Sequence, residues 1–321
     1  MSSLITAIGE ILIDLTQIGV NSSNIPLFAA NPGGAPANVA VAASRLGARS
    51  AFIGCVGHDA YGKQLRQTLE ADGVDVRGLY VTDSAPTTLA VVSVDQKGER
   101  SFQFYRHPGA DIYLNFENIS RNVLEETAIL HFGSVSLTDE PSRSATLLSA
   151  KYARNHGKLI SYDPNYRAAL WSDGDEAAAM MRRPLPMVDI LKISDEETVL
   201  LSGYEDPTEA AICLEAMGIQ LVLVTLGANG VLYRYQGRTG IVPGYHVQVS
   251  DTNGAGDTFL GAVLAKLAKR RRALSDLPEN ELRQILSYAN AAAALTTSRP
   301  GAIPAMPGKR EVLAFMERPA R

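Results

Sequence analysis

The sequence has no apolar run long enough to cross a membrane and no basic N-terminal flank of the kind that precedes a signal peptide. A membrane-spanning helix needs about 18 or more consecutive apolar residues. The apolar run at residues 4–15 is shorter than that and carries Glu10 and Asp14. We therefore expect neither a membrane partner nor a secretory signal, and we interpret residues 4–15 as the first buried strand.

Cysteine and excess charge are also scarce. The two cysteines, Cys55 and Cys213, are too few for a disulfide scaffold and suit a reducing cytoplasm. Lysine and arginine number 30 against 34 acidic residues, which gives a net charge of −4. A chain with this balance offers little attraction to a polyanion, so we expect no nucleic-acid partner. The five histidines have no metal-ligand spacing, and we expect no zinc site.

Short apolar runs alternate with amphipathic stretches along most of the chain. The expected strands are residues 51–57, 128–137, 158–163, 187–194 and 219–225, and the expected helices are residues 59–72, 142–156, 195–201, 208–217, 255–269 and 281–297. This alternation predicts an α/β fold with a central, mostly parallel sheet and helices on both faces.

One region interrupts the alternation. Residues 88–95, which contain Thr and Val, and residues 100–106 flank the Gly-containing turn sequence QKGE at residues 96–99, which predicts an antiparallel hairpin. The hairpin lies within the α/β pattern, so we expect a small inserted sheet that covers a cleft. We find no linker that divides the chain. We therefore predict a single domain over residues 1–321, with lid strands inserted at about residues 12–32 and 86–108.

Residues 251–257, with the sequence DTNGAGD, carry the clearest chemistry and lead into the helix predicted at residues 255–269. Gly254 and Gly256 allow a tight turn with accessible N–H groups, and a helix N-terminus adds about half a positive charge. Such a turn binds anions. Asp257 beside it suits a base that accepts a hydroxyl proton during phosphoryl transfer. Asp257 could equally be a helix cap, and the residues alone leave both interpretations open.

Two other nucleotide-binding patterns are excluded. Residues 57–64, GHDAYGKQ, nearly match the P-loop spacing, but Gln64 stands where a Ser or Thr hydroxyl is needed for Mg²⁺. No Gly-x-Gly-x-x-Gly follows the first strand, which argues against a Rossmann dehydrogenase.

Residues 251–257 resemble the second signature of the ribokinase-like (PfkB-type) carbohydrate kinases. Residues 31–40, NPGGAPANVA, resemble the sugar-binding signature of the same family, and the two segments are more than 200 residues apart in the expected order. The resemblance extends from about residue 5 to about residue 307. Residues 104–111 (FYRHPGAD) and 163–167 (DPNYR) are most similar to the fructokinase branch. The resemblance implies a ribokinase-like fold with a small β-sheet lid.

The resemblance also implies roles for particular residues. Asp257 would be the catalytic base, and the backbone amides of Gly254, Ala255 and Gly256 would hold the transferring phosphoryl group. The implied sugar-binding residues are Asp14, Gly33, Gly34, Asn38, Arg106 and Arg167. For Asp14 the alternative is an exposed strand end. Either arginine could bind a phosphate or a substrate carboxylate.

Nucleotide and metal sites follow from the same resemblance. The residues implied for ATP are Thr225, Gly227, Gly230 and Asn290, the last being equally compatible with a helix surface. Glu197 would arrange Mg²⁺ and phosphate through water, or would simply complement the dipole of a helix start. The residues implied for a monovalent cation, K⁺, are Asp251, Asn253, Thr296, Arg299 and Gly301.

These observations favour a cytoplasmic, ATP-dependent sugar kinase that phosphorylates a primary hydroxyl, with fructose as the first choice of substrate and fructose 6-phosphate as product. The alternatives are 2-keto-3-deoxygluconate kinase, another PfkB-type sugar kinase, and a non-catalytic regulatory homologue. Exposed lid strands could pair two copies of the chain in a homodimer.

Overall fold

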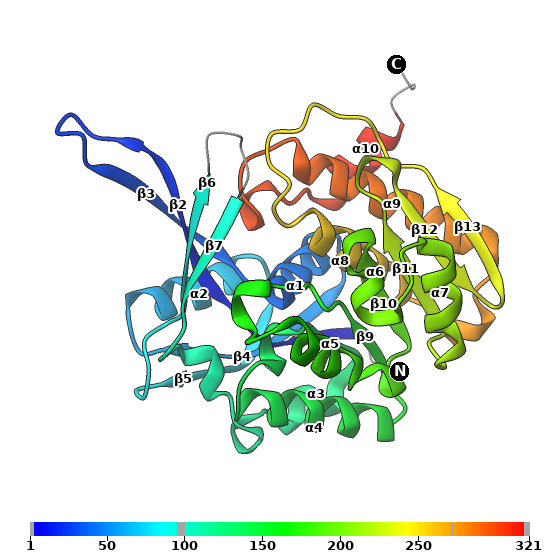
Figure 1. Cartoon of the computed structure of the whole chain (residues 1–321), viewed down its shortest axis with the longest axis horizontal. Coiled ribbons are helices and arrows are strands. Elements are labelled where there is room, and N and C mark those ends of the chain that lie inside the picture. Colours follow the sequence, from blue (N-terminus) through cyan, green and yellow to red (C-terminus); the bar gives the residue numbers. More distant parts are fainter. Residues whose placement is uncertain (1–2, 95–99, 271–272, 318–321) are drawn as a thin grey trace.

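The computed structural model describes residues 3–94, 100–270 and 273–317. Within these ranges, nine strands form a sheet with the order β13-β12-β11-β10-β9-β8-β1-β4-β5 (Figure 1). The strands are β1 (Leu4–Ile8), β4 (Arg49–Gly57), β5 (Asp75–Thr82), β8 (Thr127–Phe132), β9 (Leu159–Tyr162), β10 (Ile190–Ser194), β11 (Leu221–Thr225), β12 (Val231–Tyr235) and β13 (Arg238–Val242). All neighbours from β5 to β11 pair in parallel, and only β12 and β13 are antiparallel.

Helices cover both faces of this sheet, as the alternating pattern predicted. The helices are α1 (Ala35–Arg45), α2 (Ala60–Ala71), α3 (Arg121–Glu126), α4 (Ser142–Asn155), α5 (Gly174–Arg182), α6 (Thr198–Ser202), α7 (Pro207–Ala216), α8 (Ala255–Leu267), α9 (Glu279–Thr297) and α10 (Lys309–Met316). Alternate side chains of β1 show the two layers, because Ile5 packs with α1, α8 and α9 whereas Leu4 and Ile8 pack with α4, α5 and α7. No helix in the described part of the chain is long and apolar enough to span a bilayer.

Short 3₁₀ helices connect many of these elements. They are η1 (Ala110–Tyr113), η2 (Phe116–Asn118), η3 (Val135–Leu137), η4 (Ala168–Leu170), η5 (Leu185–Met187), η6 (Asp195–Glu197), η7 (Gly227–Asn229), η8 (Leu274–Asp276) and η9 (Ile303–Ala305). One of them, η3, falls inside the strand predicted at residues 128–137, and η5 ends at the first residue of the strand predicted at residues 187–194. Those predictions were too long, because an apolar run does not distinguish a strand from a buried 3₁₀ turn.

A second, four-stranded sheet has the order β3-β2-β6-β7. It consists of β2 (Leu12–Val20), β3 (Pro26–Gly33), β6 (Leu89–Val94) and β7 (Arg100–Tyr105). The predicted hairpin is confirmed by the antiparallel pairing of β6 with β7, and its predicted turn at residues 96–99 lies outside the described residues. The β2–β3 pair projects from the body of the molecule (Figure 1).

The interpretation of residues 4–15 as one strand is wrong. The chain leaves the large sheet after Ile8 and enters the small sheet at Leu12. The break falls at Gly9, whose φ of 148° is disfavoured for other residues and whose added Cβ would lie 2.8 Å from Pro36 Cγ. As a result, Glu10 follows the carboxyl end of β1, and Asp14 lies in the small sheet.

The direction of strand addition reverses at β1. The strands β4 and β5 lie on one side of β1, and β8 to β13 lie on the other. In open α/β sheets, ligands bind at the carboxyl ends of strands beside such a reversal. The small sheet lies over this part of the edge, because β2 and β7 contribute side chains to the same cleft as residues that follow β1 and β9.

Candidate active site

A cleft of about 480 Å³, open to solvent, lies where the large sheet meets the small one. Its walls come from segments far apart in the chain, including the start of α1, the start of α8 and the loop after β9. The lining residues are Glu10, Leu12, Asp14, Gly34, Ala35, Asn38, Phe104, Val135, Asn165, Arg167, Asn253 and Asp257. Asp14, Gly34, Asn38, Arg167 and Asp257 are residues that the sequence predicted for the site.

Asp257 is 6% exposed in the first turn of α8. Its oxygens accept hydrogen bonds from two amide side chains, Asn38 Nδ2 at 2.8 Å and Asn165 Nδ2 at 3.2 Å. The N-cap position of α8 is Gly254, without any side-chain capping bond. Asp257 is therefore held across the cleft rather than used as a helix cap. Burial raises its pKa, although the hydrogen bond from Asn38 and the charge of Lys192 oppose the increase.

The turn before α8 depends on glycine. Gly254 has a left-handed φ of 73°, and a Cβ there would lie 2.9 Å from the Ala302 side chain. Only glycine combines this conformation with so close an approach. A Cβ on Gly256 would lie 3.0 Å from Lys192 Nζ. An ammonium group therefore lies directly beside the helix N-terminus, where it adds to the attraction for an anion.

Lys192 was not predicted as a site residue. It belongs to β10, is 6% exposed, and forms an ion pair with Asp163 in which Nζ lies 2.9 Å from Oδ2. Burial lowers the pKa of Lys192, but the charges of Asp163 and Glu197 outweigh it, and the pKa is raised overall. The lysine therefore stays charged. A charged residue inside the apolar run of residues 187–194 was the available signal, the same one that identified Asp14.

The segment of residues 31–40 forms one wall of the cleft. Asp14 on β2 is 9% exposed and lines the cleft, so it is not an exposed strand end. A Cβ on Gly33 would lie 2.3 Å from Asp14 Oδ2, and a Cβ on Gly34 would lie 2.6 Å from the Glu10 carbonyl oxygen. Gly33 therefore leaves room for the Asp14 carboxylate, and Gly34 for the backbone of Glu10. Asn38 is 4% exposed, and its Oδ1 has no hydrogen-bond partner among the described residues.

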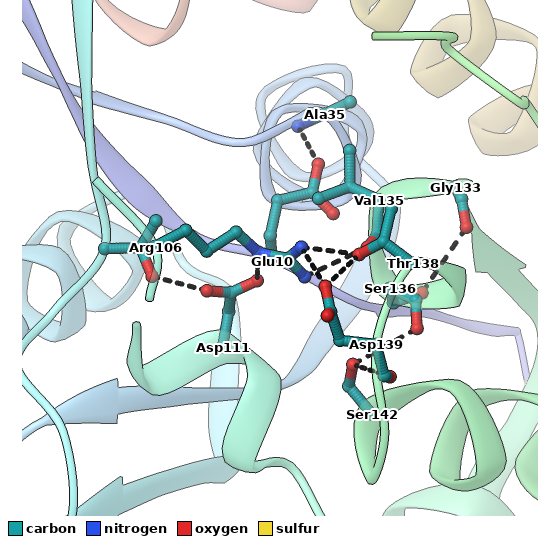
Figure 2. Close-up of polar contacts among 11 residues, drawn as sticks. Glu10, Ala35, Arg106, Asp111, Gly133, Val135, Ser136, Thr138, Asp139 and Ser142 are labelled. Atoms are coloured by element: carbon teal, nitrogen blue, oxygen red, sulfur yellow. Dashed lines mark hydrogen bonds and ion pairs between the residues drawn. The ribbon is translucent and has the colours of Figure 1, made fainter. Parts of the chain in front are cut away.

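The two predicted arginines lie in different places. Arg167 lines the cleft, and its Nη1 donates to the carbonyl oxygen of Tyr166 at 3.0 Å. Arg106 is 1% exposed and does not line the cleft; it donates to Asp111 Oδ2 at 2.7 Å and to Asp139 Oδ2 at 2.9 Å (Figure 2). Further contacts of Arg106 reach the Thr138 hydroxyl and the Val135 carbonyl oxygen. These protein partners occupy Arg106, so direct contact with a substrate would require it to exchange one of them.

Glu10 is a second cleft residue that sequence reasoning missed. It is 3% exposed, and its Oε1 accepts a hydrogen bond from the Ala35 N–H at 3.0 Å (Figure 2). Burial and the charge of Asp111 raise the pKa of Glu10 to about 8, against the opposing effect of Arg106. Glu10 was visible in the sequence as a charge in an apolar run, but it was taken only as evidence against a signal peptide.

A second cavity, of about 780 Å³, lies on the other side of the α8 N-terminus. Gly227, Gly230 and Asn290 line it, together with Thr252 and Ala255 from the start of α8. Asn290 is buried, with Nδ2 donating to the Val242 and Pro243 carbonyl oxygens at 3.0 Å, so it does not lie on a helix surface. Thr225, at the end of β11, is not among the lining residues, and its hydroxyl donates to the Ile193 carbonyl oxygen at 3.3 Å.

The residues predicted for a monovalent cation lie in the loop before α8, in the last turn of α9 and in the loop that follows it. Asp251 Oδ1 accepts from the Asn253 N–H at 2.8 Å, and Oδ2 accepts from the Gly301 N–H at 2.9 Å. The carbonyl oxygen of Thr296, a fully buried residue, accepts from the Arg299 N–H at 3.2 Å. Asp251 therefore fixes the loop of the α8 turn to the loop after α9.

Glu197, predicted near Mg²⁺, closes η6. Its Oε2 accepts from the Ser194 N–H at 2.8 Å, and its Oε1 accepts from the Tyr166 N–H at 2.7 Å. The carboxylate thus joins the end of β10 to the loop after β9. Oε2 also accepts from the Ser194 hydroxyl at 3.2 Å, so Oε1 is the oxygen with a further lone pair for a hydrogen bond from a metal-bound water.

Comparisons with known proteins agree with this geometry. A family model described as pfkB family carbohydrate kinase matches residues 2–309. Probable fructokinase-4 of Arabidopsis thaliana is 42% identical over 318 residues, which cover 98% of this chain and 97% of that protein. The fructokinase of Xylella fastidiosa with bound ATP has a TM-score of 0.92 at 35% identity, with 99% of both chains covered. A fructokinase double mutant of Vibrio cholerae O395, bound to fructose, ADP and potassium ion, has a TM-score of 0.88 at 34% identity, covering 98% of this chain and 99% of that one.

The side-chain amide groups that donate hydrogen bonds to Asp257 lead to a testable prediction. Replacing Asn165 with alanine removes a hydrogen bond that favours the ionised carboxylate, so the pKa of Asp257 should move upward from its already raised value. The measurement is a ¹³C NMR titration of the aspartate carboxyl carbons, with Asp257→Asn to assign the signal. Asn155→Ala, on the exposed end of α4, is the matched control and should leave the signal unmoved. An unchanged or lower Asp257 pKa in Asn165→Ala would contradict the prediction.

Proposed function

The chain belongs to the pfkB family of carbohydrate kinases, and we propose that it transfers the γ-phosphoryl group of ATP to the 6-hydroxyl of D-fructose in the cytoplasm. It is a sugar kinase by family. Fructose as the acceptor is supported by the fructokinase relatives and by the DPNYR segment at residues 163–167, which is most similar to that branch.

One observation carries the proposal: the first turn of α8 separates the two cavities. Asn253 and Asp257 line the cleft beside Asp14, whereas Thr252 and Ala255 line the cavity that contains Gly227 and Asn290. A sugar in the first cavity and a nucleotide in the second would therefore meet at the helix N-terminus. This is the geometry that transfer between two separately bound substrates requires.

Each part of the turn then has a chemical task. Asp257 accepts the proton of the attacking hydroxyl as the new oxygen–phosphorus bond forms and the bond to the ADP leaving group breaks. The amides of Gly254, Ala255 and Gly256 hold the oxygens of the transferring group, and the Lys192 ammonium adds a buried positive charge beside them. A lid formed by the small sheet excludes water from this step and limits ATP hydrolysis.

Arg167 is compatible with one alternative substrate, 2-keto-3-deoxygluconate. A 2-keto-3-deoxygluconate kinase needs a cation for the substrate carboxylate, and Arg167 lines the cleft where such a group would bind. A non-catalytic homologue is less favoured, because the glycines of the α8 turn and Asp257 are all present.

The substrate and the base are tested together. In a coupled ADP-release assay with fructose, tagatose, ribose, nucleosides and 2-keto-3-deoxygluconate, fructose should give the highest kcat/KM. Asp257→Ala should lower kcat on fructose by about 10²–10⁴-fold, the range expected for lost proton transfer. A higher kcat/KM for the keto acid would overturn the substrate, and a nearly unchanged kcat in the variant would remove Asp257 from the mechanism. Turnover with none of these acceptors would favour the non-catalytic alternative.

We also propose that Mg²⁺ accompanies the nucleotide and that K⁺ supports the α8 turn. The two loops joined by Asp251 suit a monovalent cation, because backbone carbonyl oxygens are the hard ligands that K⁺ prefers, and the Vibrio fructokinase was solved with potassium ion. A bound cation would stabilise the loops that present the amides. Mg²⁺ supplies charge neutralisation of the phosphates, with Glu197 able to position its waters.

Replacing K⁺ with tetramethylammonium at constant ionic strength should therefore lower kcat, because the α8 turn loses its support. Asp251→Ala should lower kcat in both salts and abolish the difference between them. The readout is initial rate at saturating fructose and ATP, with Asp173→Ala, an exposed N-cap of α5, as the control variant. Equal rates of the unmodified enzyme in the two salts would rule out a functional cation.

We propose that two copies pair through the β2–β3 projection. The projection carries exposed apolar side chains, among them Ile18 (66% exposed) and Phe28 (47% exposed). Its outer strand, β3, is an edge of the small sheet and has free backbone groups on one side. A second copy of the same chain can cover both.

Sedimentation or light scattering should give about twice the 34.4 kDa chain mass. The double variant Ile18→Glu/Phe28→Glu should be monomeric, because it places charge in the apolar contact. Ile212→Glu alters an exposed isoleucine on α7 and should stay dimeric. A monomeric unmodified protein would refute this pairing.

A further inference from the structure

We propose that Glu10 is a sugar-binding residue: its carboxyl group keeps a proton on Oε2 and donates it as a hydrogen bond to a sugar oxygen at the floor of the cleft. This proposal deepens the proposed function and rests on it, because it requires that the cleft bind a sugar. It assigns a role to a carboxyl group that neither the phosphoryl-transfer chemistry nor the two sequence signatures use.

The position of Glu10 is the first argument. Glu10 follows the carboxyl end of β1, lines the cleft and is 3% exposed. Its two oxygens differ: Oε1 accepts from the Ala35 N–H at 3.0 Å, whereas Oε2 has no hydrogen-bond partner among the described residues. Figure 2 shows the second oxygen turned away from Ala35. Oε2 is almost wholly inaccessible to solvent in this structure, so a sugar must displace the groups that cover it to form this hydrogen bond. A buried polar atom without a partner is costly until a ligand satisfies it.

The surrounding charges are the second argument, because they keep Glu10 neutral. The nearby cation, Arg106, already pairs with Asp111 at 2.7 Å and with Asp139 at 2.9 Å (Figure 2). A third carboxylate would lie beside this pair of acids in a buried site. Burial, followed by Asp111, raises the pKa of Glu10 to about 8. Hydrogen bonds from the backbone N–H groups of Glu10 and Ala35, together with the charge of Arg106, only partly offset this. The remaining charged groups that line the cleft are Asp14, Arg167 and Asp257.

The hydrogen-bonding balance of the cleft is the third argument. The Asp14 and Asp257 carboxylates can only accept hydrogen bonds when ionised. Asn38 gives its Nδ2 to Asp257 and leaves Oδ1, another acceptor, without a partner among the described residues. A sugar offers oxygens that must accept as well as hydroxyls that donate. A protonated Glu10 supplies a neutral donor on this acceptor-rich side of the cleft.

Two substitutions separate the donor from the rest of the side chain. Glu10→Gln keeps the shape, the oxygen that accepts from Ala35 and an N–H donor that does not titrate near neutral pH. Glu10→Leu keeps the bulk and removes the donor. Glu205→Gln, an exposed residue between α6 and α7, is the matched control. The assay is ADP release with fructose or, if the panel identifies another acceptor, with that sugar, between about pH 6 and 9.5, with KM for sugar and for ATP determined separately.

The unmodified enzyme and the control should show a sugar KM that rises above about pH 8, where Glu10 loses its proton, and that is about 30-fold higher at pH 9.5 than at pH 7 by simple titration. The sugar KM of Glu10→Gln should be nearly independent of pH. Glu10→Leu should raise the sugar KM by about tenfold or more at pH 7, a typical loss when a buried acceptor is left unpaired, and leave the ATP KM unchanged. Ionisation of Asp257 affects kcat and not the sugar KM: kcat should fall as the pH decreases and Asp257 becomes protonated.

Monodeoxy analogues of the sugar exclude a merely structural role. One analogue, lacking the oxygen that Glu10 contacts, should bind the unmodified enzyme as weakly as the parent sugar binds Glu10→Leu, and Glu10→Leu should not discriminate between the two. If Glu10→Leu fails to fold, the comparison of the unmodified enzyme with Glu10→Gln decides. A sugar KM that is independent of pH in the unmodified enzyme, or that rises equally in Glu10→Gln, overturns the proposal. If fructose is not phosphorylated but another sugar is, only the proposed substrate is contradicted, and the role of Glu10 is tested with that sugar.

Discussion

The carboxylate of Asp257 at the N-terminus of α8 is the constraint on which the rest of the site depends. A carboxylate near an anion-binding helix end repels the anion unless it is held to one side. Asn38 and Asn165 hold it there, one from α1 and the other from the loop after β9. Three distant segments therefore have to be positioned together before a base and an anion site can coexist. The large sheet does this, because it fixes the strand ends from which these segments emerge.

Two networks of buried ion pairs lie near Asp257 and the cleft. Lys192 and Asp163 form an ion pair beside the helix end, and Arg106 forms a second ion-pair network with Asp111 beneath the small sheet. Burying ion pairs contributes little net stability, because each charge loses its hydration. Their value here is positional: Lys192 adds positive charge where phosphate would lie, and Arg106 connects the end of β7 to the segment after β8. Glu10 lines the cleft beside the Arg106 network, and its raised pKa of about 8 favours the neutral carboxyl group near pH 7.

Much of this arrangement could be predicted from the sequence, because the two glycine-rich segments and the alternation of strands and helices are local patterns. Asp14, Asn38 and Asp257 were predicted and are found around one cleft. Lys192 and Glu10 were missed because a charge in an apolar run signals burial but not its partner, and the partners Asp163 and Ala35 lie 29 and 25 residues away in the sequence. Arg106 is the opposite case. It was predicted as a sugar-binding residue, but its protein partners were not predicted, because Thr138 and Asp139 follow a turn that was taken for a strand. The break at Gly9, where the first strand divides between the two sheets, was not predicted because it does not change the pattern of apolar residues.

The most direct test of the central arrangement is a crystal structure with fructose and a non-hydrolysable ATP analogue bound together. The 6-hydroxyl oxygen should lie about 2.6–3.2 Å from an oxygen of Asp257, the distance over which a base accepts a proton. The terminal phosphate should contact the backbone amides of the α8 turn. A sugar whose hydroxyls all point away from Asp257, or a nucleotide whose phosphates end far from that turn, would contradict the arrangement.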